Sequence, residues 1–288
     1  MENTNYNKLF GSLIIYSVIF TLLPIGLLSF IKDSSMVLII TAIIAFIPIY
    51  FAMGHVEFIH QLTQKRERVN PLFLVLLALA PMGSNIIGGV VEAGIKSILK
   101  LFGLSIFNTA GEMASEITSV PTLSVILYTC IIAPLVEELV FRNYLYRKIE
   151  KPKPWVAVVT TGIVFAFMHN NFDQSISVIP TGIYFSYLAY RYSIWVPILA
   201  HILNNTIFSL SALLVGTEYE SVVTNGIFWV GIIASIIVFV SIFRYFKRTR
   251  HDALGSDEVI YTKNIFFWLL IIISVAMMFL NEFATKLA

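Results

Sequence analysis

The feature that most constrains this chain is a series of apolar runs that carry no charged residue. A helix needs about 20 apolar residues to cross the hydrocarbon core of a bilayer, and a helix satisfies its backbone polar groups within the segment itself. Only 12% of the 288 residues are charged and 58% are hydrophobic, whereas about a quarter of a soluble domain is charged. We therefore predict an all-α fold, a polytopic transmembrane helical bundle of eight to nine spans. The runs occupy residues 9–31, 34–54, 69–91, 117–136, 154–168, 174–190, 192–217, 221–243 and 264–281.

One segment between the third and fourth runs has a different pattern. Lys96 and Lys100 are four residues apart within an otherwise apolar stretch. This spacing predicts an amphipathic helix over 94–108 that lies on the membrane surface; a re-entrant segment is the alternative.

The distribution of charge predicts how the chain is oriented. Lysine and arginine gather after the second, fourth, sixth and eighth runs, whereas Asp173, Glu218 and Glu220 lie after the fifth and seventh. Cytoplasmic loops carry the excess of basic residues, so we predict a multi-pass protein of the cell membrane with a cytoplasmic N-terminus. Lys96 and Lys100 then fall outside, which counts against this threading. The net charge of only +2 argues against nucleic acid as a partner.

Few ionisable residues lie within or beside the apolar runs, and such residues are functional candidates because burying them in a membrane is costly. Counted from the basic groups at about 1.5 Å per residue, Glu137 lies roughly 15–20 Å deep, His169 roughly 22–25 Å and His201 about 15 Å. These depths fall in the middle or outer middle of a core about 30 Å thick. Three helices are therefore predicted to bring polar groups to a similar level.

The adjacent acids Glu137 and Glu138 are predicted to have different roles. Neighbouring helical residues point about 100° apart, and Glu138 is four residues before Arg142, the favourable order for a helical ion pair. Glu138 would then be a structural acid, whereas Glu137 would be free to act as a general base. The alternative is that both glutamates pair with basic residues at the membrane interface.

The two histidines could complete a site. His169 follows Phe165 by one turn, and His201 shares a helix face with Asn205. Imidazole can bind a metal, orient a water or donate to an oxyanion; the alternative is a structural role for each ring. Motifs of other intramembrane proteases are missing: the sequence has no His-Glu-x-x-His, no pair of aspartates within the runs and no Gly-x-Ser-Gly.

Three motifs in order, 137-EELVFR-142, 165-FAFMH-169 and 201-HILNN-205, resemble the CAAX protease and bacteriocin-processing (CPBP, or Abi) family, which is related to the Ras-converting CAAX endopeptidase. The resemblance covers roughly 120–213. It implies an intramembrane endopeptidase with a catalytic core at 116–215, between N-terminal transmembrane and interfacial helices at 1–115 and C-terminal transmembrane helices at 216–288. It further implies that Glu137 activates the water and that Glu138 and Arg142 support the site. The implied oxyanion or metal ligands are His169, His201 and Asn205.

The resemblance leaves the cofactor and the class of protein open. Either no cofactor is required, or Zn²⁺ is held by His169 and His201. A three-ligand zinc site would use Glu137 and leave no obvious base, which favours the first alternative. The expected partners are the lipid bilayer and a membrane-embedded or membrane-associated peptide or protein substrate. The second functional hypothesis is a non-catalytic membrane adaptor, or a bacteriocin self-immunity or regulatory protein. A transporter is disfavoured because no paired broken helices occur in repeated halves.

Overall fold

The computed structural model describes residues 4–64, 66–103, 122–151, 153–253 and 259–287, without the side chains of 250–253 and 281–287. Every named element in these ranges is a helix, which confirms the all-α prediction. Five helices are long and apolar enough to cross a membrane, and two shorter apolar helices accompany them. The chain is a multi-pass membrane protein. The five are α1 (Tyr6–Leu27), α2 (Ser34–Met53), α4 (Pro71–Leu101), the continuous helix Leu123–Ile149, and α13 (Glu220–Ala253), in which the candidate span is Glu220–Thr249.

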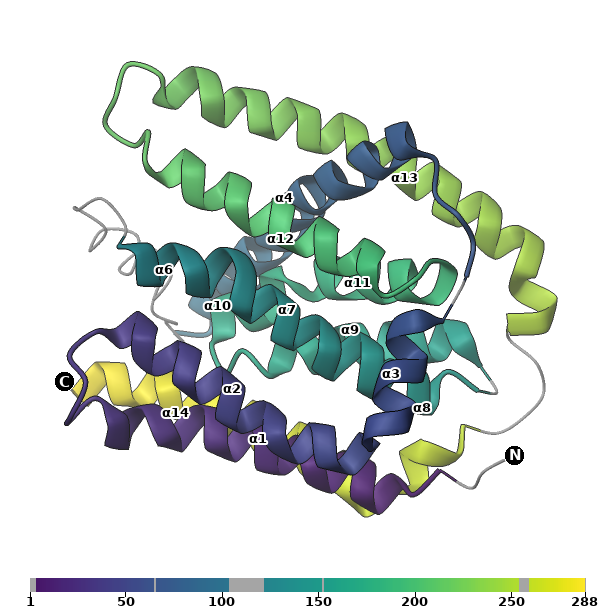
Figure 1. Cartoon of the computed structure of the whole chain (residues 1–288). Coiled ribbons are helices and arrows are strands. Elements are labelled where there is room, and N and C mark those ends of the chain that lie inside the picture. The colour runs from purple at the N-terminus through teal and green to yellow at the C-terminus, as the bar shows by residue number, and fades with distance from the viewer. Residues whose placement is uncertain (1–3, 65, 104–121, 152, 254–258, 288) are drawn as a thin grey trace.

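The helices form a bundle in which the polar motifs are central. Figure 1 shows α1, α2 and α14 (Ile265–Leu287) along one side of the bundle, and α4, α12 (Trp195–Ala212) and α13 along the other. The helix Leu123–Ile149, α9 (Pro154–Phe167) and α11 (Ile179–Arg191) lie between these two groups. Two of the three motif-bearing segments therefore lie between the two groups, and the third lies on α12, at the edge of one of them.

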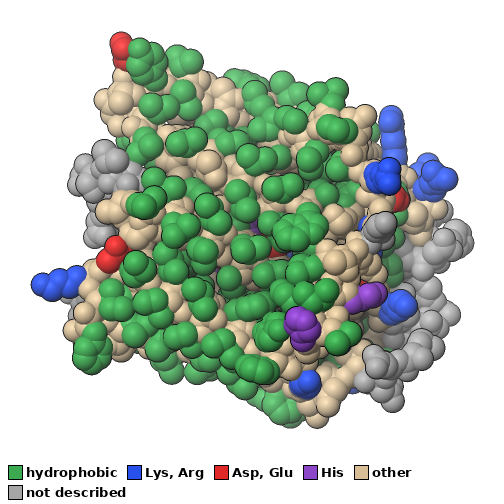
Figure 2. Space-filling view, in the orientation of Figure 1, with side chains coloured by type: hydrophobic (Ala, Val, Ile, Leu, Met, Phe, Trp, Pro, Cys, Tyr) green, Lys and Arg blue, Asp and Glu red, His purple; other side chains and the backbone are tan. Residues whose placement is uncertain are grey.

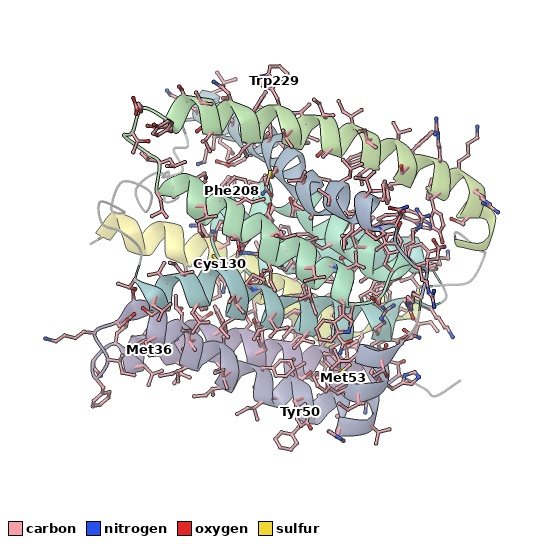
Figure 3. The ribbon with its side chains drawn as sticks, turned by 45° about the horizontal axis from the view of Figure 1, so that its top comes forward. Met36, Tyr50, Met53, Cys130, Phe208 and Trp229 are labelled. Carbon is pink, nitrogen blue, oxygen red and sulfur yellow. The ribbon has the colours of Figure 1, made fainter. Side chains whose placement is uncertain are left out.

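The outer surface has the character expected of a lipid-facing one. Figure 2 shows hydrophobic side chains over the middle of one face, with most of its Lys and Arg at one end of the molecule. That end also carries the N-terminus and α3 (His55–Thr63) in Figure 1. Trp229 points outward from α13 and is 60% exposed, whereas Cys130 lies inside the bundle (Figure 3). The apolar exterior and the basic end define a membrane axis.

The amphipathic helix predicted at 94–108 is not a separate element. Residues 94–101 are the last turns of α4, which runs unbroken from Pro71 to Leu101; residues 104–108 lie outside the described residues. No proline lies between residues 94 and 101, and Lys96 forms an i,i+4 ion pair with Glu92 at 3.0 Å. Lys96 also pairs with the buried Asp173 of α10 (Phe172–Ser177), so it joins two helices instead of facing the membrane surface.

The fourth run also continues further than predicted. The expected boundary was residue 136, but the helix extends to Ile149, and residues 117–121 lie outside the described part. Its segments are α6 (Leu123–Leu127), η1 (Tyr128–Ile132), α7 (Ala133–Glu138), η2 (Leu139–Tyr146) and α8 (Arg147–Ile149). The η1 and η2 segments are π-helices, a form often found at functional sites. The helix does not end at its charged residues because partners inside the bundle bind them.

The short helix α9 places its end within the protein. Its 14 residues span about 21 Å at 1.5 Å per residue, less than the core thickness of about 30 Å. The sequence suggested that His169 lies on this helix. The helix instead ends at Phe167, and His169 lies in the turn that follows it. Asn170 has a positive φ of 53°, which asparagine tolerates better than most residues, and the chain then turns into α10.

Helices α9 and α11 make an unusually close contact. A Cβ atom at Gly182 would lie 2.6 Å from the carbonyl oxygen of Gly162, closer than side chains are found to pack. Glycine at both positions lets the two backbones approach. This brings the Gly182 carbonyl into the centre of the bundle, where it accepts a hydrogen bond from Arg142.

Candidate active site

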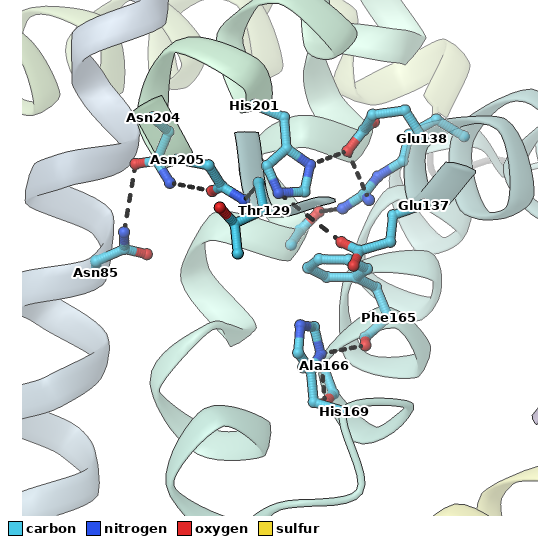
Figure 4. A network of polar contacts seen from close by, with 12 residues as sticks. Asn85, Thr129, Glu137, Glu138, Phe165, Ala166, His169, His201, Asn204 and Asn205 are labelled. Carbon is cyan, nitrogen blue, oxygen red and sulfur yellow. Dashed lines mark hydrogen bonds and ion pairs between the residues drawn. The ribbon is translucent and has the colours of Figure 1, made fainter. Parts of the chain in front are cut away.

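Glu138 is the centre of the polar cluster. Its side chain is fully buried, and its Oε1 accepts from Arg142 Nη1 at 3.0 Å and from His201 Nδ1 at 2.9 Å (Figure 4). The ion pair predicted from the i,i+4 spacing is therefore present. The contact with His201 was not predicted, because it joins two helices and their rotation relative to each other cannot be read from the sequence of either helix.

Arg142 is held by aromatic rings as well as by hydrogen bonds. It is fully buried, and its Nη2 donates to the Gly182 carbonyl at 2.9 Å. Its guanidinium carbon lies 4.2 Å from the centroid of the Phe165 ring and 5.6 Å from that of Phe185. Arginine over an aromatic face is stabilised electrostatically, and more so when it is desolvated. The charge is thus kept in one position within an apolar surrounding.

His201 joins the buried acid to the second glutamate. Its ring stacks on Phe185, with centroids 4.7 Å apart, and is 6% exposed. A ring nitrogen that faces a carboxylate donates to it, so the proton on Nδ1 points to Glu138 and Nε2 faces the other way. Nε2 is 3.8 Å from Oε2 of Glu137, too long for a direct hydrogen bond but short enough for one water to bridge.

The two acids therefore have different surroundings. The side chain of Glu137 is 22% exposed, whereas that of Glu138 is 0% exposed. No lysine or arginine in the described part of the chain forms an ion pair with Glu137; its ionic contact there is with His201. Glu138 has two strong donors, and Glu137 has a partly accessible carboxylate beside an imidazole.

His169 lies beside this cluster without a hydrogen bond to it among the described residues. Its Nδ1 is 3.0 Å from the carbonyl oxygen of Phe165 and 3.2 Å from that of Ala166, so Nδ1 donates and a neutral ring leaves Nε2 as an acceptor. The His169 and Phe165 rings meet edge to face at 4.9 Å. In Figure 4, His169 lies across the Phe165 ring from the Glu138 cluster.

Asn205 is anchored by a carbonyl that a proline leaves free. In η1 the N–H of Ala133 bonds to the carbonyl of Tyr128, and Pro134 has no N–H to offer to the next carbonyl, that of Thr129. The Thr129 carbonyl instead accepts from Nδ2 of Asn205 at 2.9 Å. The π-helical turn and the proline thus create the acceptor that fixes this amide.

A chain of polar side chains continues from Asn205 towards α4. Asn204 donates to Asn205 at 3.1 Å and accepts from Asn85 at 3.4 Å, and Thr181 donates to Asn85 at 2.5 Å. The sequence motifs did not point to Asn85, Asn204 and Thr181. A search of the apolar runs for uncharged polar residues, as well as for charged ones, would have found them.

The predicted site residues thus fall into one connected cluster and two neighbours. Contacts join Glu137, His201, Glu138 and Arg142. Within the described part of the chain, His169 reaches this cluster through the aromatic ring of Phe165, and Asn205 belongs to the separate chain of amides. Figure 4 shows Glu137, Glu138, His169, His201 and Asn205 around one region of the bundle.

The ligands for a metal do not come together. Among the described residues, no group of three or more His, Cys, Asp or Glu side chains is placed to hold a metal ion. Nδ1 of His201 is bonded to Glu138 and Nδ1 of His169 to backbone carbonyls, so each histidine would offer one nitrogen. Zinc takes three or four protein ligands. The placed residues do not fit a zinc site, and we derive no step through a metal.

Comparisons with known proteins identify the segment that carries the site. The family described as "Type II CAAX prenyl endopeptidase Rce1-like" matches residues 119–207, which include all six predicted site residues. The "Putative membrane peptidase YdiL" of Bacillus subtilis (strain 168) is 30% identical over 92 residues, which are 31% of this chain and 37% of that protein. The alignment therefore spans little more than a third of that relative. No solved structure matches the chain.

The geometry and the comparisons agree on the same part of the chain. The family match begins within the residues before α6 and ends in α12, so it contains η1, both glutamates, the turn at His169 and the His201 motif. In this multi-pass membrane protein, residues 119–207 are similar to the Type II CAAX prenyl endopeptidase (Rce1-like) family, which supports the resemblance to the CAAX protease and bacteriocin-processing family.

Proposed function

We propose that this chain is an intramembrane endopeptidase that hydrolyses a peptide bond of a membrane-embedded or membrane-associated substrate, with Glu137 as the base that activates the water. The observation that carries the proposal is the unequal environment of the two acids. Glu138 is fully buried and bonded to Arg142 and His201, whereas Glu137 is partly exposed and lies 3.8 Å from Nε2 of His201. A base must reach both water and substrate, and Glu137 has the access that Glu138 lacks.

The proposed step uses one water and no other reagent. The oxygen of the water bonds to the substrate carbonyl carbon while Glu137 takes a proton from this water. The carbonyl oxygen becomes an oxyanion. The protonated Glu137 then gives this proton to the leaving nitrogen as the C–N bond breaks. A positioned base of this kind contributes roughly 10²–10⁴-fold to the rate.

The remaining residues would position the water and stabilise the charge. His201 is held by Glu138 through Nδ1, and in its protonated form it places positive charge and an Nε2–H next to the oxyanion. Asn205 donates one amide hydrogen to Thr129 and keeps a second, which is available to the same oxyanion. His169, with Nδ1 bonded to backbone carbonyls, has Nε2 available to accept a hydrogen bond from the attacking water.

Substitution of Glu137 by glutamine tests the proposal. Glutamine has the same shape but cannot accept the proton, so we expect turnover to fall by roughly 10²–10⁴-fold with little change in the stability of the fold. The membrane peptides of cells that express the wild type or Glu137→Gln would be compared by mass spectrometry. Unfolding of both purified proteins would show whether the variant is intact.

The matched control is the neighbouring substitution, Glu138→Gln, which should lower stability as well as activity. A folded Glu137→Gln protein that produces the wild-type peptides would overturn the role of this residue. If Glu137→Gln also keeps the cellular phenotype of the wild type, the non-catalytic adaptor or self-immunity hypothesis becomes the better one.

We also propose that the basic end of the bundle, with the N-terminus, faces the cytoplasm. Several basic connections converge there and are tied by ion pairs: Arg66 with Glu150 at 3.1 Å, and Lys148 with Glu57 at 2.6 Å. Cysteine placed at Tyr219, which is 59% exposed at the opposite end, should react with an impermeant thiol reagent from outside. Reaction only after the membrane is opened would reverse the orientation. The buried Cys130 gives a low background.

We further infer that the core at 116–215 carries the chemistry and that 1–115 and 216–288 support it. Tyr184 of the core donates to the Leu77 carbonyl of the N-terminal part at 2.7 Å, and Ser235 of the C-terminal part donates to the Ala80 carbonyl of the N-terminal part at 2.7 Å. The core expressed alone should therefore misfold. A monodisperse, folded fragment in detergent would contradict this division of roles.

A further inference from the structure

A second polar feature lies apart from the candidate active site, at the basic end of the bundle. It is a cavity of about 310 Å³ between α4, α11 and α13. It is lined by three arginines, two aromatic residues and a serine: Arg191, Arg244, Arg248, Phe73, Tyr245 and Ser241. The proposed hydrolysis uses none of them.

One of these arginines is fixed in place. Arg191 donates through Nε to Glu67 at 2.8 Å and through Nη1 to the hydroxyl of Tyr187 at 3.0 Å. Its guanidinium carbon lies 4.5 Å from the centroid of the Tyr245 ring. None of the hydrogen bonds among the described residues uses Nη2, so the guanidinium is held without using all its donors. Glu67 is bonded to Arg191 but is not among the residues that line the cavity.

The other two arginines have no such partner among the described side chains. Arg244 and Arg248 are one turn apart on α13, and no carboxylate in the described part of the chain forms an ion pair with either. Like charges at i,i+4 destabilise a helix. An anion bound between them would offset this repulsion, and guanidinium groups match the oxygens of a phosphate in two-point hydrogen bonds.

The surface next to the cavity indicates the source of the anion. The preceding turns of α13 expose large apolar side chains outward, among them Ile236, Val240 and Phe243 at 59%, 44% and 68%. In a membrane these turns contact acyl chains, so the cavity lies at the level where the acyl region meets the headgroups. Basic pockets between transmembrane helices at this level bind anionic headgroups.

We propose that this cavity binds the phosphodiester headgroup of an anionic phospholipid. Arg244 and Arg248 hold the phosphate oxygens, and Arg191 presents its remaining donor from the opposite wall. Phe73 and Tyr245 form the apolar sides of the cavity, and the acyl chains lie along the exposed turns of α13. The lipid thereby joins α13 to α11, which belongs to the family-matched segment.

Native mass spectrometry of the whole protein in detergent tests the proposal. The probes are phosphatidylglycerol and phosphatidylcholine with identical acyl chains, and the variant is Arg244→Gln/Arg248→Gln. We expect the wild type to retain phosphatidylglycerol in preference to phosphatidylcholine. The double variant should bind phosphatidylglycerol roughly 30-fold more weakly, which is about 2 kcal/mol at 1.4 kcal/mol per tenfold.

The matched control is Lys151→Gln/Lys247→Gln, which removes two charges from the same end of the molecule but none from the cavity. Unchanged phosphatidylglycerol binding by the control supports the proposal, and an equal loss in both double variants overturns it. Full competition by inorganic phosphate would show a free-anion site and also overturn it. If the arginine variant does not fold, equal binding of both lipids by the wild type is sufficient to refute the proposal.

Discussion

Arg142→Met is the most informative perturbation of the buried cluster. Methionine has a similar length and no charge, so the substitution removes the cation while it keeps most of the packing against the aromatic rings. Glu138 is then left fully buried, and among the described residues His201 is the one donor that remains. The carbonyl of Gly182 loses Arg142 but still accepts from Ser186 at 2.9 Å.

The magnitude follows from which groups lose their partners. Removal of one member of a buried ion pair costs about 3–5 kcal/mol because the other charge stays buried. His201 continues to bond Glu138, and Gly182 keeps one donor, so we expect the lower half of that range, about 3–4 kcal/mol. In Glu138→Gln/Arg142→Met both charges are gone. The double variant should therefore be more stable than Arg142→Met, by about 1–3 kcal/mol of coupling.

Equilibrium unfolding in mixed micelles, followed by circular dichroism, would measure these differences. The control is Arg68→Met, an exposed position, where we expect a change within about 0.5 kcal/mol. If Arg142→Met is as stable as that control, the pair contributes little and Glu138 is not a buried anion. If the double variant is less stable than both singles, the reasoning from an unpaired charge is wrong.

Two further substitutions test the contacts that position the site. Gly182→Ala would place a Cβ 2.6 Å from the carbonyl oxygen of Gly162 and should cost about 1–3 kcal/mol by overpacking. Gly226→Ala, which meets nothing within 4 Å, is its control; equal unfolding midpoints would refute the close packing. Asn205→Ala should lose about 1–3 kcal/mol because the carbonyl of Thr129 is left without this donor, and turnover should fall as well. Wild-type turnover in a folded Asn205→Ala protein would remove Asn205 from the proposed site.

Contacts within one helix could be predicted from the sequence because their spacing fixes them. The apolar runs predicted helices because few other structures satisfy the backbone polar groups inside a bilayer. The structure has helices at these positions. Glu138 and Arg142 were expected to pair because four residues are close to one turn, and they do at 3.0 Å. Pro134 has no N–H, so the sequence also predicts that one carbonyl of the preceding turn needs another donor.

Element boundaries were less predictable, because a charged residue ends a membrane helix only if nothing inside the protein binds it. The fourth helix runs past Glu138 and Arg142 to Ile149 since both are satisfied within the bundle. Helix α4 continues past residue 94 because Lys96 finds Glu92 and Asp173. In both cases at least one partner of the charged residue lies on another helix, and this contact lets the helix continue.

Contacts between helices were decided by the tertiary structure alone. Whether His201 faces Glu138, and whether Asn85 meets Asn204, depends on how far each helix is rotated and shifted along its axis. The π-helical turns around α7 change the rotation by an amount that a regular helical period does not describe. The sequence by itself therefore determined which residues could form a site, and the packing of α9, α11 and α12 around α7 determined which of them touch.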